Sequence, residues 1–209
     1  KSRIPEKYKD FDYTKVSFAC KHEGAIIKPV EDSILYCYLP TSTSWGLPFL
    51  MNTDMIPKGD RNDIEKEVDL LELNVKEDEI EDSEEMNFNE ALSSIAGSKF
   101  FFWVRDLLTS RKYQLGSVFS LVPDFKKCKR EHKDYTRFIE KFESDFNTCL
   151  ETETIVPVPQ GIALVNKVIL DTTGLSTSGI MTDDEFRKFS GMEDYYLPLP
   201  MLRKDKHFN

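Results

Sequence analysis

Residues able to bind a metal ion or act as nucleophiles are few in this chain and lie far apart. The three histidines, His22, His132 and His207, are isolated from one another, and no CxxC pair is present. Zinc sites are marked by closely spaced Cys and His ligands, so we predict no metal site. Spacing alone leaves open a Ser-His-Asp or Cys-His arrangement, although no GxSxG nucleophile elbow occurs.

Anion binding by backbone amides is a second kind of chemistry to consider, at residues 174–179 (GLSTSG). Amides at the mouth of a helix bind anions, but a Gly/Ser/Thr-rich stretch is more often a flexible loop, and we favour that interpretation. The chain contains neither GxxxxGK[ST] nor GxGxxG. It therefore carries no familiar nucleotide-binding motif of its own.

A basic run at residues 126–133 (KKCKREHK) has aromatic neighbours, Phe125 and Tyr135. Clustered Lys and Arg side chains contact phosphates in nucleic-acid-binding proteins. The run is short and stands alone, so we favour a solvated helix start, or an internal partner for an acidic segment. Nucleic acid is the less favoured partner.

The formal net charge of −9 over 209 residues comes from one segment. Residues 63–85 contain twelve acidic residues and two lysines, whereas the rest of the chain has 25 acidic and 26 basic residues. This pattern indicates a domain in which acidic and basic residues are nearly equal in number, interrupted by an acidic insert. No apolar run reaches the roughly 18 residues of a membrane helix, so we expect no membrane contact. The separated cysteines favour free thiols in a cytoplasmic protein. They are Cys20, Cys37, Cys128 and Cys149.

Short β-branched and aromatic runs predict strands at residues 13–20, 25–30 and 34–39, joined by tight turns as an antiparallel meander. The apolar run 47–56 contains Pro48, which is typical of an edge or entering strand. A loop at residues 57–60 follows. Asp60 or Asn62 is then expected to cap a helix that begins near Asp63.

Helical periodicity dominates the middle of the chain. Asn87 precedes a helical pattern that Gly97 interrupts with a kink or a break, and residues 135–149 form the cleanest amphipathic helix. Consecutive aromatics at residues 100–103 point all around a helix, so some of them must meet a second element or another domain.

The last quarter of the chain is expected to be α/β. Residues 155–158 and 195–199 are extended, and residues 161–170 are the most convincing buried strand. Thr182 and Glu185 form a capping box for a helix that Gly191 ends.

The segment at residues 47–65, LPFLMNTDMIPKGDRNDIE, carries the most specific pattern in the chain, with YLPT shortly before it. It resembles the segment ending in a catalytic loop in the middle domain of the ninety-kilodalton heat-shock chaperones. It is still more similar to the region that follows the histidine-kinase-like (GHKL) ATP-binding domain in sacsin-like bacterial proteins. In that pattern a strand carrying "LP" leads to a loop arginine, which here is Arg61.

The resemblance implies that Arg61 reaches the terminal phosphate of ATP held by an upstream domain, with Lys58 adding a point charge. An always-charged, forked donor suits a transferring phosphoryl group. The sequence departs from the chaperone pattern at Glu65, where a glutamine is expected, and in the acidic insert. The alternative is structural: Arg61 pairs with Asp60 or Asp63.

The resulting prediction is an α/β (α+β) domain, a small mixed sheet with packed helices similar to the transducer-like middle domain of these ATPases. We divide it into a connector (1–12), a β-rich part with the phosphate-sensing loop (13–64), an acidic insert (65–86), a helical and α/β part (87–200) and a tail (201–209). The chain begins at Lys1 without an initiator Met, so we expect a longer parent protein.

Two functions are compatible with these features. The first is a non-catalytic relay that binds no cofactor itself. It would transmit the nucleotide state of the ATP/Mg site in an upstream ATP-binding domain of the same chain, and the parent protein would act on a protein client. The second is a protein-interaction or scaffold module without ATP linkage. An Asn-bearing helix and a DxGxG motif upstream of Lys1 would favour the relay.

Overall fold

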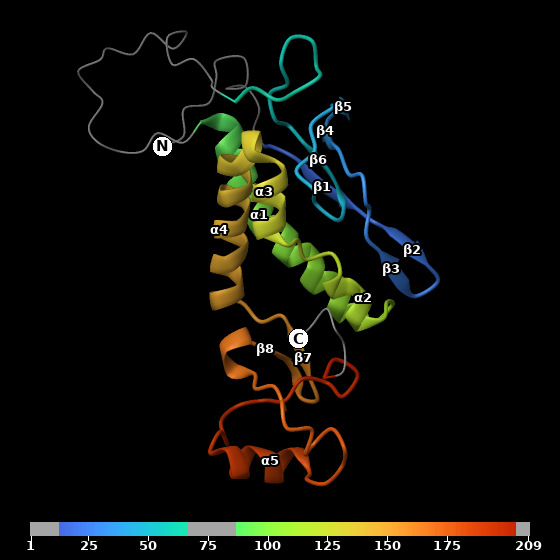
Figure 1. Ribbon diagram of the computed structural model, residues 1–209, viewed down its shortest axis with the longest axis vertical. Helices are drawn as coiled ribbons and strands as arrows, with labels where there is room; N and C mark the ends of the chain where they lie inside the picture. Colours follow the sequence, from blue (N-terminus) through green and yellow to red (C-terminus); the bar gives the residue numbers. More distant parts are fainter. Residues whose placement is uncertain (1–12, 67–86, 204–209) are drawn as a thin grey trace, which may run out of the picture.

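Four short strands form a mixed sheet in the first part of the chain (Figure 1). The computed structural model describes residues 13–66 and 87–203. The strands are β1 (Val16–Ala19), β4 (Leu35–Cys37), β5 (Leu39–Pro40) and β6 (Leu50–Thr53). Their order is β1-β6-β4-β5, with β6 antiparallel to β1 and parallel to β4. The predicted small mixed sheet is confirmed, and the fold is of the α+β class.

The pairing of the strands differs from the predicted antiparallel meander. β2 (Lys21–Glu23) and β3 (Ile26–Lys28) form a separate two-stranded hairpin, and β1 pairs with the distant β6. β6 is central rather than at an edge, because Pro48 lies before the strand and removes no ladder hydrogen bond. Strand propensity locates strands without specifying their partners.

Two long helices, α1 (Phe88–Thr109) and α4 (Thr136–Thr152), pack against each other. The predicted amphipathic helix is confirmed as α4. α1 is continuous through Gly97, so the helix does not break there. A Cβ atom on Gly97 would lie 2.1 Å from the backbone oxygen of Phe142. Gly97 is therefore needed where α4 comes close to α1. The shorter helices between them are α2 (Leu115–Phe119), α3 (Phe125–Glu131) and the 3-10 turn η4 (Lys133–Tyr135).

The aromatic run at residues 100–103 is part of the core. Phe100 and Phe101 are fully buried. The ring of Phe100 stacks on Phe49 with 4.4 Å between centroids, and Trp103 stacks on Phe18 at 5.4 Å. The second element that these rings require is thus supplied by the sheet of the same chain. The run gives no support to an interface with another domain.

The C-terminal part lies beyond the end of α4, away from the four-stranded sheet (Figure 1). It contains the hairpin β7 (Val156–Val158) and β8 (Gly161–Ala163), the turn η5 (Val165–Lys167) and the helix α5 (Asp183–Ser190). The predicted buried strand at residues 161–170 is wrong. Only its first three residues pair with β7, and Val168 makes a single bridge to Tyr196. An apolar run becomes a buried strand only where a partner strand extends beside it.

The ends of α5 agree with the sequence in detail. The Thr182 hydroxyl accepts a hydrogen bond from the Glu185 amide, and the Glu185 carboxylate accepts from the Thr182 amide. Gly191 adopts a left-handed conformation with φ 68° after the last turn. The predicted capping box and the glycine stop are confirmed, because both depend only on residues close in the chain.

Candidate functional site

The segment with the family resemblance forms a narrow loop after the central strand β6, here called the 56–65 loop. The Glu65 amide donates to the Ile56 carbonyl at 2.9 Å, and the Lys58 amide donates to the Asp63 carbonyl at 2.8 Å. At the tip, the Arg61 amide donates to the Lys58 carbonyl at 2.8 Å. Residues 63–66 form a bridge and a bend, so the helix predicted to begin near Asp63 is wrong there. The rest of the predicted acidic insert, residues 67–86, lies outside the described residues.

Arg61 occupies the tip of this loop and is exposed. Its φ of 58° lies in the left-handed region, which non-glycine residues seldom adopt. Asp60 is engaged with the amide of Asn62 at 3.0 Å. Within residues 13–66 and 87–203, the structure shows no hydrogen bond or ion pair of the Arg61 guanidinium with either Asp60 or Asp63.

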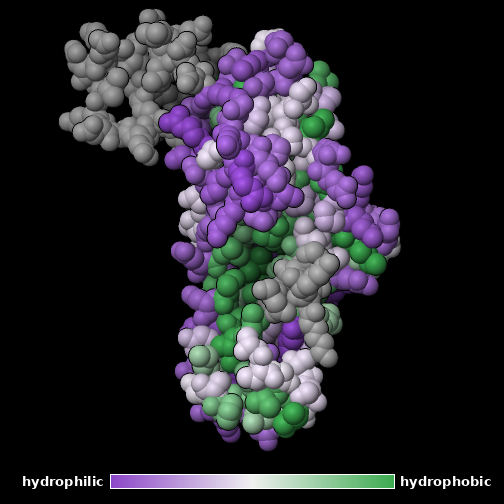
Figure 2. Space-filling view, in the orientation of Figure 1, coloured by the Kyte–Doolittle hydropathy of each residue, from purple (hydrophilic) through white to green (hydrophobic). Residues whose placement is uncertain are grey.

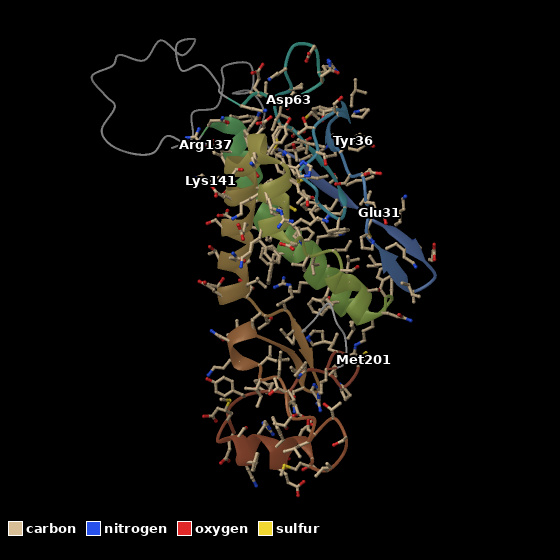
Figure 3. All side chains as sticks on the ribbon, in the orientation of Figure 1. Glu31, Tyr36, Asp63, Arg137, Lys141 and Met201 are labelled. Atoms are coloured by element: carbon tan, nitrogen blue, oxygen red, sulfur yellow. The ribbon has the colours of Figure 1, made fainter. Side chains whose placement is uncertain are left out.

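Asp63 is the most highly connected polar side chain of the loop. Its Oδ1 atom accepts hydrogen bonds from the Tyr135 hydroxyl at 2.7 Å, the Thr43 hydroxyl at 2.9 Å and the Ile64 amide at 2.8 Å. Its Oδ2 atom lies 3.3 Å from Lys58 Nζ and 3.5 Å from Lys66 Nζ. Figure 3 shows Asp63 and Arg137, on the first turn of α4, at the same end of the molecule.

These contacts set the protonation states around Asp63. Burial by itself raises the pKa of Asp63, but the hydrogen bonds from Tyr135, Thr43 and Ile64 outweigh it and lower the pKa to about 2. Burial and the hydrogen bond to Asp63 raise the pKa of Tyr135 to about 12. At neutral pH Asp63 is therefore a fixed anion and Tyr135 a fixed donor.

The two cations predicted for phosphate contact are placed differently. Lys58 is in an ion pair with Asp63, whereas Arg61 extends from the tip. A third cation, Lys66, was not predicted; its ammonium lies 4.4 Å from the centroid of the Tyr135 ring and 3.8 Å from Asp134. Sequence analysis missed Lys66, although one partner, Asp63, lies only three residues before it; the other partner, Tyr135, is far away in the sequence.

A buried asparagine attaches the loop to α1. Asn89 is fully buried, and its side-chain oxygen accepts from the Ile56 amide at 2.8 Å. Its side-chain nitrogen donates to the Ile56 carbonyl at 3.0 Å and the Glu65 carbonyl at 2.8 Å. Asn89 thus joins both arms of the 56–65 loop. Sequence analysis missed it, and the one available signal was an amide side chain in the first turn of an apolar helix.

The Gly/Ser/Thr-rich stretch binds an anion from its own chain. The amides of Gly174, Ser176 and Thr177 donate to the Asp171 carboxylate at 2.7–3.1 Å. Burial by itself raises the pKa of Asp171, but the hydrogen bonds from hydroxyls and amides together outweigh it and hold the pKa well below its usual range. The stretch is therefore a turn closed around Asp171. This structure differs from both sequence-based interpretations, an open anion-binding site and a flexible loop.

The basic run forms α3, and part of its charge is paired. Lys129 contacts Glu143 at 2.7 Å, and Arg130 contacts Glu131 at 3.4 Å. Cys128 and His132 both line a cleft of about 320 Å³ beside Gly46. Burial raises the pKa of the Cys128 thiol to about 11. The geometry therefore disfavours a thiolate nucleophile there.

Other features of the chain bear on the function classes. All four cysteines are free. Within the described ranges, no three Cys, His, Asp or Glu side chains gather to hold a metal ion, and no helix is long and apolar enough to cross a membrane. Comparison of the chain with protein-family models, curated proteins and solved structures finds no match.

Proposed function

We propose that this chain is the non-catalytic transducer domain of a larger ATPase of the sacsin-like or heat-shock-chaperone type. In this proposal Arg61 reaches the terminal phosphate of ATP bound, with Mg²⁺, in an upstream domain of the same protein. The observation that carries it is the attachment of the 56–65 loop to both long helices, through Asn89 on α1 and through the Asp63–Tyr135 hydrogen bond just before α4.

A relay needs a mechanical connection between the nucleotide sensor and the rest of the domain. Displacing the 56–65 loop alone would break the buried hydrogen bonds of Asn89, and an unsatisfied buried polar group costs about 1–3 kcal/mol. It would also break the bond from Tyr135 to Asp63. Motion of the loop together with α1 and α4 avoids both costs. The attachment therefore favours transmission of a loop displacement to the helices.

The tip of the loop suits the proposed role of Arg61. The guanidinium is always charged and presents forked donors, which match the oxygens of a phosphoryl group. A left-handed backbone at a non-glycine residue stores strain, and such residues concentrate at functional sites. On its own, this chain is expected neither to bind ATP tightly nor to hydrolyse it, because the nucleotide pocket belongs to the upstream domain.

ATP turnover by the parent protein tests the proposal, with Arg61→Ala compared to wild type. We expect a decrease of about tenfold or more, which corresponds to about 1.4 kcal/mol of transition-state stabilisation. Arg111→Ala is the matched control, since Arg111 is also an exposed arginine in a left-handed conformation, with φ 54°. Equal turnover in wild type and Arg61→Ala, or a parent without ATPase activity, would refute the relay.

The alternative function, a protein-interaction module, is favoured by the surface of the C-terminal part. Ile180, Phe189 and Met201 are 71%, 66% and 65% exposed. Figure 2 shows apolar residues over the lower half of this face, while the upper half is mostly hydrophilic. Exposed apolar surface often marks a binding site. If this function is correct, an apolar fluorescent dye should bind the chain. The double variant Ile180→Ser with Met201→Ser should then bind less dye than wild type, and undiminished dye binding would argue against this function.

A further inference from the structure

Two lysine ammonium groups converge on one atom of the 56–65 loop. Lys58 Nζ and Lys66 Nζ lie 3.3 Å and 3.5 Å from Asp63 Oδ2. They come from opposite arms of the loop, one before the tip and one after it. Two ammonium groups that both contact a single oxygen are close enough together for one phosphate group to contact both.

The two oxygens of Asp63 have different partners. Oδ1 accepts three hydrogen bonds of 2.7–2.9 Å from Tyr135, Thr43 and the Ile64 amide. Oδ2 makes the longer contacts, with the two lysines. Losing the lysines would therefore leave Asp63 held through Oδ1. The Asp63 carboxylate can therefore keep its position when the two lysines leave it and bind another anion.

Water also reaches both lysine contacts. The side chains of Lys58 and Lys66 are 43% and 31% exposed and that of Asp63 is 20% exposed, and ion pairs open to water contribute little. The remaining groups facing Lys66 are the Tyr135 ring and Asp134, whose side chain is 82% exposed. A ligand that offers more charge than one carboxylate oxygen can therefore displace Asp63 from the lysines at small cost.

We propose that Lys58 and Lys66 form a phosphate-binding pair beside Arg61, and that Asp63 Oδ2 occupies this pair until a phosphate-bearing ligand replaces it. A phosphate group presents several strong acceptor oxygens and more than one negative charge, so it competes well against a single carboxylate oxygen. Asp63 then regulates the affinity of the tip, because its charge competes with the ligand for both lysines. The inference rests on the proposed function for the identity of the ligand, and adds Lys66 and Asp63 to the site.

The test is binding of inorganic tripolyphosphate to this chain at low ionic strength, measured by titration calorimetry. Asp63→Asn keeps an acceptor oxygen for Tyr135, Thr43 and Ile64 and removes the competing charge. We expect this variant to bind about tenfold more tightly than wild type. Lys58→Met and Lys66→Met are then added to Asp63→Asn. This triple variant should bind tripolyphosphate at least tenfold more weakly than Asp63→Asn alone.

A second double variant separates this site from general electrostatic attraction. Lys126→Met with Lys188→Met removes the same charge from exposed lysines elsewhere on the chain. Combined with Asp63→Asn, it should change the affinity less than twofold. The proposal is overturned if this control weakens binding as much as the Lys58/Lys66 variant. It is also overturned if folded Asp63→Asn binds no more tightly than wild type, including the case in which neither binds.

The outcome is independent of the ATPase experiment. Loss of turnover in Arg61→Ala without any tripolyphosphate effect at Lys58 and Lys66 would keep the relay and remove the lysine pair. Tripolyphosphate binding at the lysine pair with unchanged turnover in Arg61→Ala would keep the lysine pair and remove the relay. Urea unfolding of each variant verifies that it is folded before its affinity is interpreted.

Discussion

The 56–65 loop and the 171–179 loop both contain residues suited to bind an anion, but they are held in opposite ways. The first is fixed by residues distant in the sequence, Asn89 on α1 and Tyr135 before α4. The second is fixed mainly by Asp171, whose partners lie within six residues of it, and receives one hydrogen bond from a distant residue, from Arg203 to the Ser176 hydroxyl at 3.2 Å. A loop bonded to distant elements moves with them, whereas a loop closed on itself can open without disturbing the fold.

The difference also explains why only one of the loops remains a candidate for ligand contact. In the 171–179 loop the amides that an anion would need are occupied by Asp171. In the 56–65 loop the backbone bonds close the arms, and the exposed tip presents the side chain of Arg61. Four substitutions test this contrast.

Asn89→Ala should have the largest effect. It removes three buried hydrogen bonds to Ile56 and Glu65, so we expect the free energy of unfolding to fall by about 3 kcal/mol. Asn87→Ala is the control; it removes the N-cap of α1 and one hydrogen bond to the Lys66 carbonyl, and should cost less, about 1–2 kcal/mol. Urea denaturation measures both. Equal losses would mean that Asn89 is no more than a helix-start residue, and the attachment to α1 would lose its importance.

The second prediction concerns pH. The pKa of Asp63 is about 2 in the folded chain against a usual 3.8. A lowered folded pKa stabilises the fold above the unfolded value, and this contribution, about 2 kcal/mol, is lost as the pH falls from about 4 to 2. Asp63→Asn should therefore be less stable than wild type at pH 7, and the difference should shrink toward pH 2. A difference that stays constant with pH would contradict the hydrogen-bonded carboxylate.

Asp171→Ala should cost less, about 1 kcal/mol, because water can reach the loop and every amide bonded to Asp171 is local. The clearer readout is hydrogen exchange. The amides of Gly174, Ser176 and Thr177 should lose protection, while those of α1 and α4 keep theirs. Loss of protection in α1 would show that the 171–179 loop is coupled to the body of the domain, and the contrast would fail.

Arg61→Gly should have the smallest effect on stability and the opposite sign. Relief of the left-handed backbone favours the folded state by about 1 kcal/mol, and the extra freedom of glycine in the unfolded chain offsets roughly half of it. We expect a net gain of about 0.5 kcal/mol in urea denaturation. Ala in place of Arg61 should give no gain, so it is the matched comparison. A clear loss with glycine would reveal a structural contact of the Arg61 side chain.

The sequence predicted much of the local structure and little of the pairing. The amphipathic pattern located α4, and the cap signals located both ends of α5. The strands β1 and β6 were also expected near their observed positions, yet their mutual pairing was not. Which strands pair depends on the packing of Phe49 and Phe18 against α1, and strand propensity carries no information about that choice.

For the candidate site, the sequence alone determined the residue types: a loop arginine at Arg61, a lysine at Lys58 and an acidic residue at Asp63. Tertiary structure decided their relations, pairing Lys58 and Lys66 with Asp63, attaching Asp63 to Tyr135 and joining the loop to Asn89. Capping and helical periodicity act between neighbours in the chain, so a sequence displays them directly. Contacts between distant residues depend on which surfaces are buried together, and only the folded chain establishes that.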